Sequence, residues 1–216
     1  MIGVSNSAVT GASSGDGTVS IGFDTPVTRI EVLWGEAPGT DLTTAPGQPA
    51  FALHDFSFCT PERDYSDAPT STTSYGEVAH DLGSGLTLGA AGTADAGGFD
   101  SPNADGDSDD GIVIPTLTSS VTTRFSMTVS EPTAFLQGWV DWNGDGDFAD
   151  ANEQIALDLQ DDGSGVDTTA ADGVIDFDVV VPGSAMPSTF ARFRLSSVAG
   201  IASDLAFAVD GEVEDY

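Results

Sequence analysis

The motif with the most specific chemistry is an acidic segment at residues 141–148, which reads DWNGDGDF. Asp141, Asn143 and Asp145 place oxygen-bearing side chains at every second position, as at positions 1, 3 and 5 of an EF-hand calcium loop. Gly146 stands at position 6, where such a loop makes its sharp turn. The spacing therefore predicts a calcium loop, and the alternative is an ordinary turn rich in Asp, Asn and Gly.

Two features of this loop depart from the EF-hand pattern. Asp147 at position 7 would offer its carbonyl oxygen, but position 12, the usual place of a bidentate glutamate, holds Asn152. Glu153 follows one residue later and is the candidate for closing the coordination shell. The flank at 135–142 has the pattern of a β-strand rather than a helix. We therefore expect EF-hand-like chemistry on a β scaffold, with Ca²⁺ as the cofactor.

Three further acidic groups are considered as cation ligands. Segment 103–110 alternates acidic side chains in the same way, although a solvated loop would have the same composition. Its aspartates are Asp105, Asp107, Asp109 and Asp110. Glu212 and Glu214 lie on one face of a C-terminal strand, where their charges repel unless a cation or an arginine lies between them. The aspartates at 158–172 are interpreted as a solvated turn.

The overall charge limits the possible partners. The 216 residues include 35 acidic and 5 basic ones, which gives a formal net charge of −30. Nucleic acids and anionic membranes bind through Lys and Arg, so neither is an expected partner. A hydrophobic share of 39% is enough for a folded core, and no apolar window of about 18 residues predicts membrane insertion. Bound cations or a saline extracellular setting would offset the charge.

Strand patterns dominate the chain, because 26 glycines and 11 prolines interrupt every helical period. The alternating runs lie at 19–23, 30–34, 51–58, 125–129, 135–142, 155–159, 175–181, 191–195 and 206–213. They predict an all-β fold, an antiparallel β-sandwich with long acidic calcium-binding loops. Residues 1–60 hold few strands for a stable sheet, so we expect them to belong to a preceding β-sandwich or to pack onto a second domain at 61–216.

The second domain carries a series of short motifs in a fixed order. They are DYSDAP at 64–69, SYG at 74–76, LGA at 88–90, DDGI at 109–112, GWVDWNGDGDF at 138–148, ARFRL at 191–195 and DGEVEDY at 210–216. In this order they resemble the GEVED (GEVEDY) domain of secreted and surface proteins of marine and other environmental bacteria. The resemblance implies a β-sandwich accessory module that calcium stabilises, with no defined activity. Residues 17–59 resemble the last strands of a β-sandwich that often precedes this domain.

The resemblance also suggests how the acidic motifs meet. The entry motif with Asp64 and Asp67, the DDGI segment and the exit motif with Glu212 are expected to converge on one ion. This hypothesis rests on residue types, since carboxylates from distant segments are typical ligands of a stabilising Ca²⁺.

No catalytic motif is found in the chain. His54 and His80 stand outside any nucleophile or metal-ligand motif, and His80 is expected to form structural hydrogen bonds. We therefore expect a non-catalytic module of a secreted or cell-surface protein. Its first expected function is attachment to a polysaccharide, and the alternative is a structural or adhesive unit that binds neighbouring protein modules.

Four residues are candidates for contacting a carbohydrate. They are Trp34, Trp142, Arg192 and Arg194. An exposed tryptophan stacks on sugar rings, and arginines bind sulfate or carboxylate groups. The alternatives are core packing for the tryptophans and neutralisation of the acidic loops for the arginines. Trp139 and Trp142 lie three residues apart in one predicted strand, so they are expected on opposite faces.

Overall fold

The computed structural model describes residues 62–70, 73–89, 101–106 and 111–216. All of them lie in one unit, Phe58–Tyr216, and the strands expected within residues 1–60 lie outside the described residues. The described elements are β1 Arg63–Tyr65, β2 Ala79–Asp81, the 3₁₀ helix η1 Leu82–Ser84, β3 Thr122–Thr128, β4 Phe135–Val140, β5 Gln154–Leu159, β6 Val174–Val180, β7 Ala191–Ser196, β8 Phe207–Ala208 and β9 Glu212–Asp215. None of these elements is an α-helix, so the predicted all-β class is confirmed for the described part.

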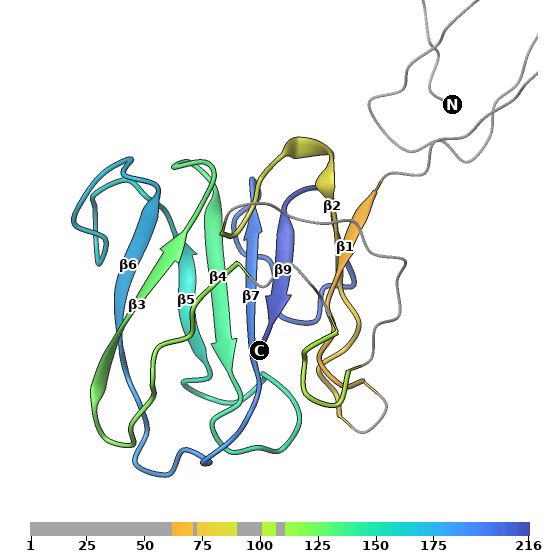
Figure 1. Ribbon diagram of the computed structural model, residues 1–216, viewed down its shortest axis with the longest axis vertical. Helices are drawn as coiled ribbons and strands as arrows, with labels where there is room; N and C mark the ends of the chain where they lie inside the picture. Colours follow the sequence, from red (N-terminus) through yellow and green to blue (C-terminus); the bar gives the residue numbers. More distant parts are fainter. Residues whose placement is uncertain (1–61, 71–72, 90–100, 107–110) are drawn as a thin grey trace, which may run out of the picture. The chain divides into compact units, whose positions relative to one another are not determined.

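A four-stranded antiparallel sheet with the order β5-β4-β7-β9 forms the centre of the fold (Figure 1). Alternation gives each of its strands two different faces. In β7, Phe193 and Leu195 belong to the large apolar core, whereas Arg192 and Arg194 project from the opposite face. The core side of the sheet is mainly apolar, but β9 adds the buried Glu212 and Glu214 to it, paired with Leu195 and Phe193. The other side carries the buried charges of Arg192, Arg194 and Asp215.

Strands β3 and β6 pair with each other and cover the apolar face of the central sheet. Phe125 of β3 lies opposite Phe177 of β6, and their rings stack with centroids 5.3 Å apart. The ring of Phe125 also lies 6.1 Å from that of Phe193 in the central sheet. This packing of two antiparallel layers around one core is the arrangement of a β-sandwich.

A small sheet with the order β1-β2-β8 lies beside β9 (Figure 1). Its β1–β2 pair is antiparallel, and its β2–β8 pair is parallel. The sequence pattern did not predict β1 or β2, because strands of three residues are too short to display a period. Next to this sheet, Ala68, Tyr75, Trp139 and Phe148 form a second apolar cluster on the charged face of the central sheet.

The expected strands between 125 and 195 coincide with β3, β4, β5, β6 and β7. The single strand expected at 206–213 is instead two strands, β8 and β9, which are separated around Gly211. Gly211 has φ +95°, and a Cβ atom there would overlap the carbonyl oxygen of Leu195. No helix in the described residues is long and apolar enough to cross a membrane.

Candidate metal centre

The loop that joins β4 to β5 is organised around Asp141, the first residue after β4. Its carboxylate is fully buried and accepts hydrogen bonds from two loop amides, Gly144 N to Oδ1 at 2.6 Å and Gly146 N to Oδ2 at 3.0 Å. Gly146 has φ +93°, a conformation that favours glycine, and this lets the loop turn back over the carboxylate. The local fold thus follows the sharp turn that the sequence predicts at this position.

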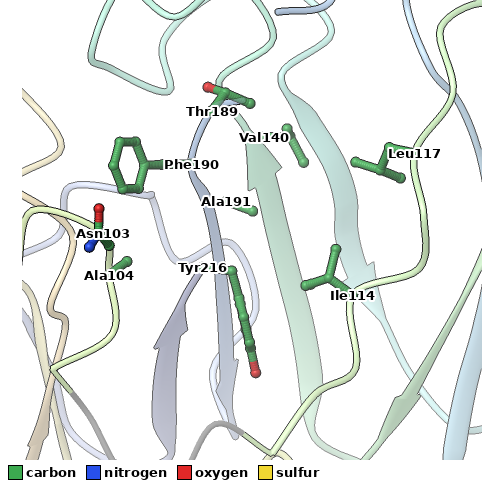
Figure 2. A pocket seen from close by; sticks show the side chains of 9 residues that line it. All are labelled: Asn103, Ala104, Ile114, Leu117, Val140, Thr189, Phe190, Ala191 and Tyr216. Atoms are coloured by element: carbon green, nitrogen blue, oxygen red, sulfur yellow. The ribbon is translucent and has the colours of Figure 1, made fainter. Parts of the chain in front are cut away.

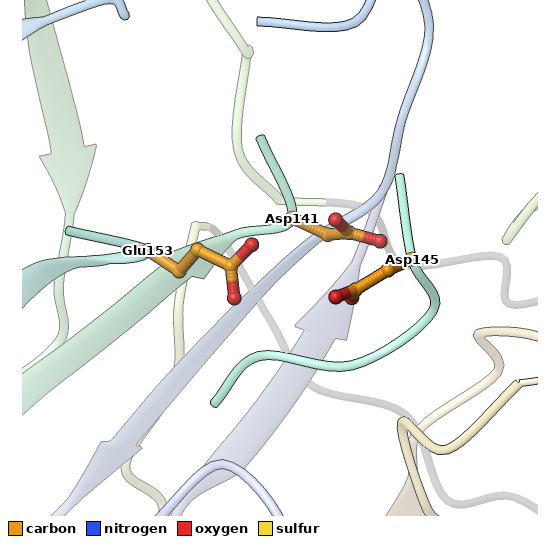
Figure 3. Close-up of side chains that lie close together, drawn as sticks. All are labelled: Asp141, Asp145 and Glu153. Atoms are coloured by element: carbon orange, nitrogen blue, oxygen red, sulfur yellow. The ribbon is translucent and has the colours of Figure 1, made fainter. Parts of the chain in front are cut away.

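Glu153 closes the loop despite its displaced position in the sequence. Compared with an EF-hand loop, the glutamate stands one residue later. Asn152, the residue before it, adopts the left-handed conformation with φ +73°. Carboxylate oxygens of Asp141, Asp145 and Glu153 all lie within 4.8 Å of one another, and Figure 3 shows the three side chains facing a common space. The structure therefore brings together the first, third and last of the five expected ligand residues, Asp141, Asp145 and Glu153.

The carboxylate of Glu153 is in an unfavourable environment in the absence of a cation. Its side chain is 1% exposed, Oε2 accepts a hydrogen bond from Asp150 N at 3.0 Å, and Oε1 has no hydrogen-bond partner. Burial raises the pKa of Glu153 to about 7, and the charges of Asp141, Asp145 and Asp150 act in the same direction. A cation between the carboxylates would supply the missing partner and remove the repulsion.

Asn143 and Asp147, the other two residues predicted from the spacing, form side-chain hydrogen bonds within the loop. The Asn143 amide donates to Asp145 Oδ2 at 3.0 Å and to Asp150 Oδ2 at 2.6 Å. Asp147 Oδ1 accepts a hydrogen bond from Ala149 N at 2.9 Å. Asp150, which the sequence reading did not single out, therefore neighbours both Asn143 and Glu153 at the rim of the site.

The acidic residues of the entry motif bind backbone amides of the exit motif and of the segment at 101–106. Asp64 Oδ2 accepts from Val213 N at 2.5 Å, and Asp67 Oδ2 accepts from Gly106 N at 2.6 Å. Both carboxylates are buried, so each one satisfies a backbone N–H group that water would otherwise bind. Charge-assisted hydrogen bonds therefore hold these carboxylates, and the expected convergence of the motifs on one ion stays a prediction.

Both glutamates of the exit motif show the same pattern. Glu212 Oε2 accepts a hydrogen bond from Leu88 N, and Glu214 Oε1 accepts one from Gly111 N at 3.4 Å.

Among the described residues, the only acidic, histidine or cysteine group placed to hold an ion is the one at Asp141, Asp145 and Glu153. Asp105 is exposed and bonds Ser101, whereas Asp107, Asp109 and Asp110 lie outside the described residues.

The two arginines of β7 are not available to a carbohydrate, because neither has any exposed surface. Arg192 forms a bidentate ion pair with Asp215 and also donates to the carbonyl oxygens of Tyr75, Gly76 and Ser203. The candidate role of Arg192 in ligand binding is therefore corrected. Its charge is used inside the protein, in agreement with the alternative of neutralising acidic groups.

Arg194 is held by a histidine rather than by a carboxylate. Its Nε donates to His80 Nε2 at 2.8 Å, and the other ring nitrogen, Nδ1, bonds Asp210 O at 2.7 Å. Burial and then the neighbouring Arg194 lower the pKa of His80 to about 3, so the ring is neutral and accepts the bond. The predicted structural role of His80 is confirmed, and the candidate ligand-binding role of Arg194 is corrected.

The tryptophans lie in separate clusters, as their spacing predicts, and both are buried. Trp139 belongs to the cluster around Tyr75, and Trp142 belongs to the main core with its Nε1 donating to Asn152 O at 3.0 Å. Trp142 therefore anchors the loop that joins β4 to β5 and has only 6% of its surface exposed. Its candidate role in sugar stacking is corrected, and Trp34 lies outside the described residues.

A separate cavity of about 320 Å³ lies near the start of β7 (Figure 2). Ile114, Leu117, Val140, Phe190 and Tyr216 contribute most of its apolar lining. None of its lining residues carries a charged side chain, so it lacks the carboxylates that a hard cation prefers. The chemistry of the described unit is concentrated in the loop after β4.

Fold and site define the unit as an all-β domain with an acidic loop that is suited to a hard cation. Residues 135–216 match the family model of the GEVED domain, so the predicted GEVED domain is confirmed over this range. Neither a search of curated proteins nor a search of solved structures found a match.

Proposed function

We propose that this unit is a calcium-stabilised, non-catalytic module of a secreted bacterial protein. One observation carries the proposal: the buried Oε1 of Glu153 has no hydrogen-bond partner, and its carboxylate faces Asp141 and Asp145 (Figure 3). Three carboxylates in this arrangement repel one another unless a cation lies between them. Ca²⁺ suits the site because it accepts several carboxylate oxygens from a flexible loop.

The bound ion would act on stability rather than on chemistry. Asp141 follows β4 and Glu153 precedes β5, so a cation held by both would join the two ends of the loop. At 100 times its dissociation constant, a ligand adds about 2.7 kcal/mol to the stability of the folded state. Extracellular calcium modules bind with dissociation constants of roughly 10⁻⁴–10⁻³ M, and we expect an affinity in this range for a secreted module.

The absence of catalysis is proposed from the state of the candidate groups. His80, the histidine among the described residues, has both ring nitrogens engaged and is fully buried. A general base must reach a substrate proton, and this ring cannot do so in the folded protein.

For the partner of the module, we propose neighbouring protein modules of a surface or adhesive structure. No aromatic side chain in the described ranges is exposed, and both β7 arginines are buried. Polysaccharide attachment would therefore depend on residues outside these ranges, such as Trp34. A glycan array distinguishes the two: binding to a polysaccharide would favour attachment, and binding to none would favour the structural role.

Thermal melting in calcium and in chelator tests the calcium proposal. We expect saturating Ca²⁺ to raise the Tm of the wild type by about 5–10 °C. Glu153→Gln should lose most of this shift, whereas Glu131→Gln, in an exposed turn, should keep it. An equal Tm for the wild type with and without Ca²⁺ would exclude a stabilising calcium site.

A further inference from the structure

The metal loop receives a side chain from a segment far outside the matched family range. Tyr75, from the segment that precedes β2, donates its hydroxyl hydrogen to Asp141 Oδ2 at 2.6 Å. The residue is 2% exposed, so water does not compete for this hydrogen bond. The hydroxyl therefore acts as a buried donor to the candidate ligand.

Further contacts bind the same segment to the loop. Ser74 N donates to Gly146 O at 2.6 Å, which joins the segment to the glycine at the sharp turn. The ring of Tyr75 lies 4.5 Å from that of Phe148, the residue at position 8 of the loop. Arg192 holds the segment from the other side by donating to Tyr75 O at 2.8 Å and to Gly76 O at 3.1 Å.

We propose that Tyr75 is a positioning residue of the cation site, so that cation binding to the loop and docking of residues 73–76 stabilise each other. The proposal rests on the proposed calcium function and adds a segment to that site. Tyr75 does not touch the ion in this scheme. It acts through Asp141, whose carboxylate it orients.

Tyr75 can influence the cation site because hydrogen-bond donors determine the orientation of the Asp141 carboxylate. Gly144 N, Gly146 N and the Tyr75 hydroxyl all donate to this carboxylate, and only the last comes from outside the loop. Outer partners of this kind set the direction of a metal ligand, and their removal typically lowers metal affinity about 10–100-fold. Linkage then requires the reverse effect: an ion that favours this orientation of Asp141 also favours the docked position of Tyr75.

Binding of Tb³⁺ to the full chain tests this coupling, with luminescence sensitised by Trp142 as the readout and Ca²⁺ as the competitor. We expect Tyr75→Phe, which removes one hydroxyl and keeps the ring, to weaken Tb³⁺ and Ca²⁺ binding about 10-fold. Tyr65→Phe removes a hydroxyl in β1 and should leave both affinities unchanged. Equal affinities for the wild type and Tyr75→Phe would overturn the positioning role while leaving the calcium site intact. A wild type that binds neither ion would overturn the proposed function as well.

Hydrogen exchange of the wild type provides a test that does not depend on a variant folding. The Ser74 amide, which donates to Gly146 O, should exchange at least several-fold more slowly in saturating Ca²⁺ than in chelator. The amide of Val121, which lies in the turn before β3 and bonds Thr118 O, should be unaffected beyond the global change in stability. Calcium binding without added protection of Ser74 would overturn the coupling.

Discussion

Arg192 and Asp215 form a bidentate ion pair in which neither side chain has any exposed surface, with Nε–Oδ1 at 2.7 Å and Nη2–Oδ2 at 2.8 Å. Asp215 Oδ2 also accepts a hydrogen bond from Ala68 N at 2.9 Å. The pair therefore connects β7, the exit motif on β9 and the entry motif that precedes β2. Because all these groups are out of water, the geometry of each bond matters for stability.

Breaking this pair is expected to be strongly destabilising. Arg192→Met leaves the carboxylate of Asp215 buried with no cationic partner, and removal of one member of a buried pair typically costs about 3–5 kcal/mol. Urea denaturation in saturating calcium measures the loss. A loss below about 1 kcal/mol would show that water or another group replaces the guanidinium.

An exposed pair in the same protein serves as the control. Arg124 on β3 contacts Asp176 at 3.2 Å and Asp178 at 3.1 Å, but its side chain is 45% exposed. Solvent screens such pairs, so Arg124→Met should leave the urea midpoint close to that of the wild type.

The strands of the sandwich were predictable because their alternation runs over five or more residues. Val174–Val180 of β6, for example, places Ile175, Phe177 and Val179 in the core at every second position. β1 and β2 were not predictable, because three residues show no period and their pairing depends on segments far along the chain. Local sequence therefore determines which segments extend, and tertiary contacts determine which short ones pair.

The candidate site was predictable in its loop and not in its contacts. The spacing indicated Asp141 and Asp145, because a short loop can turn in only a few ways. Glu153 was also a candidate, but the sequence did not show that Asn152 adopts a left-handed conformation just before it. The hydrogen-bond partner of Asp64 is a backbone amide 149 residues away in the sequence. The local sequence around Asp64 therefore cannot predict whether its carboxylate binds a cation or an N–H group. Tyr75 was missed as part of the site for the same reason.

The glycine of the exit motif is expected to be irreplaceable. Gly211 has φ +95°, and a Cβ atom there would overlap the carbonyl oxygen of Leu195 in the neighbouring strand. Gly211→Ala combines backbone strain with this clash, so we expect a loss of more than about 3 kcal/mol in urea denaturation. Gly200→Ala is the matched control, since Gly200 has φ +73° with open space around it. Similar losses for the two variants would show that backbone conformation alone accounts for the effect.

Acid should destabilise the fold through His80. The folded pKa of His80, about 3, lies below its ordinary value of 6.5, because burial and then Arg194 disfavour the charged ring. Between these two values the unfolded chain binds the proton that the folded protein excludes, so stability is lost as the pH falls. The full shift corresponds to at most about 5 kcal/mol. The charged groups around the ring are Arg194, Arg192 and Asp210, and the first two oppose a second positive charge.

A variant that cannot be protonated isolates this contribution. His80→Gln should be less stable than the wild type at pH 7, because it loses packing and one hydrogen bond, but its stability should fall less steeply between pH 6.5 and pH 4. Carboxylates elsewhere titrate in both proteins, so the difference between the two urea-denaturation series measures His80. Parallel curves over this range would exclude the ring as the sensitive group.

Neutralising single aspartates of the metal loop distinguishes the observed carboxylate cluster from the full EF-hand pattern. Asp145 lies in the cluster with Asp141 and Glu153, whereas Asp147 bonds Ala149 N through its side chain. Asp145→Asn should therefore weaken Ca²⁺ binding at least about 10-fold in isothermal titration, because one ligand charge is lost from the coordination shell. Asp147→Asn keeps any contribution from the backbone carbonyl and should change the affinity by less than about three-fold. Equal weakening by the two substitutions would mean that the ion is centred elsewhere in the loop, with both carboxylates in its shell.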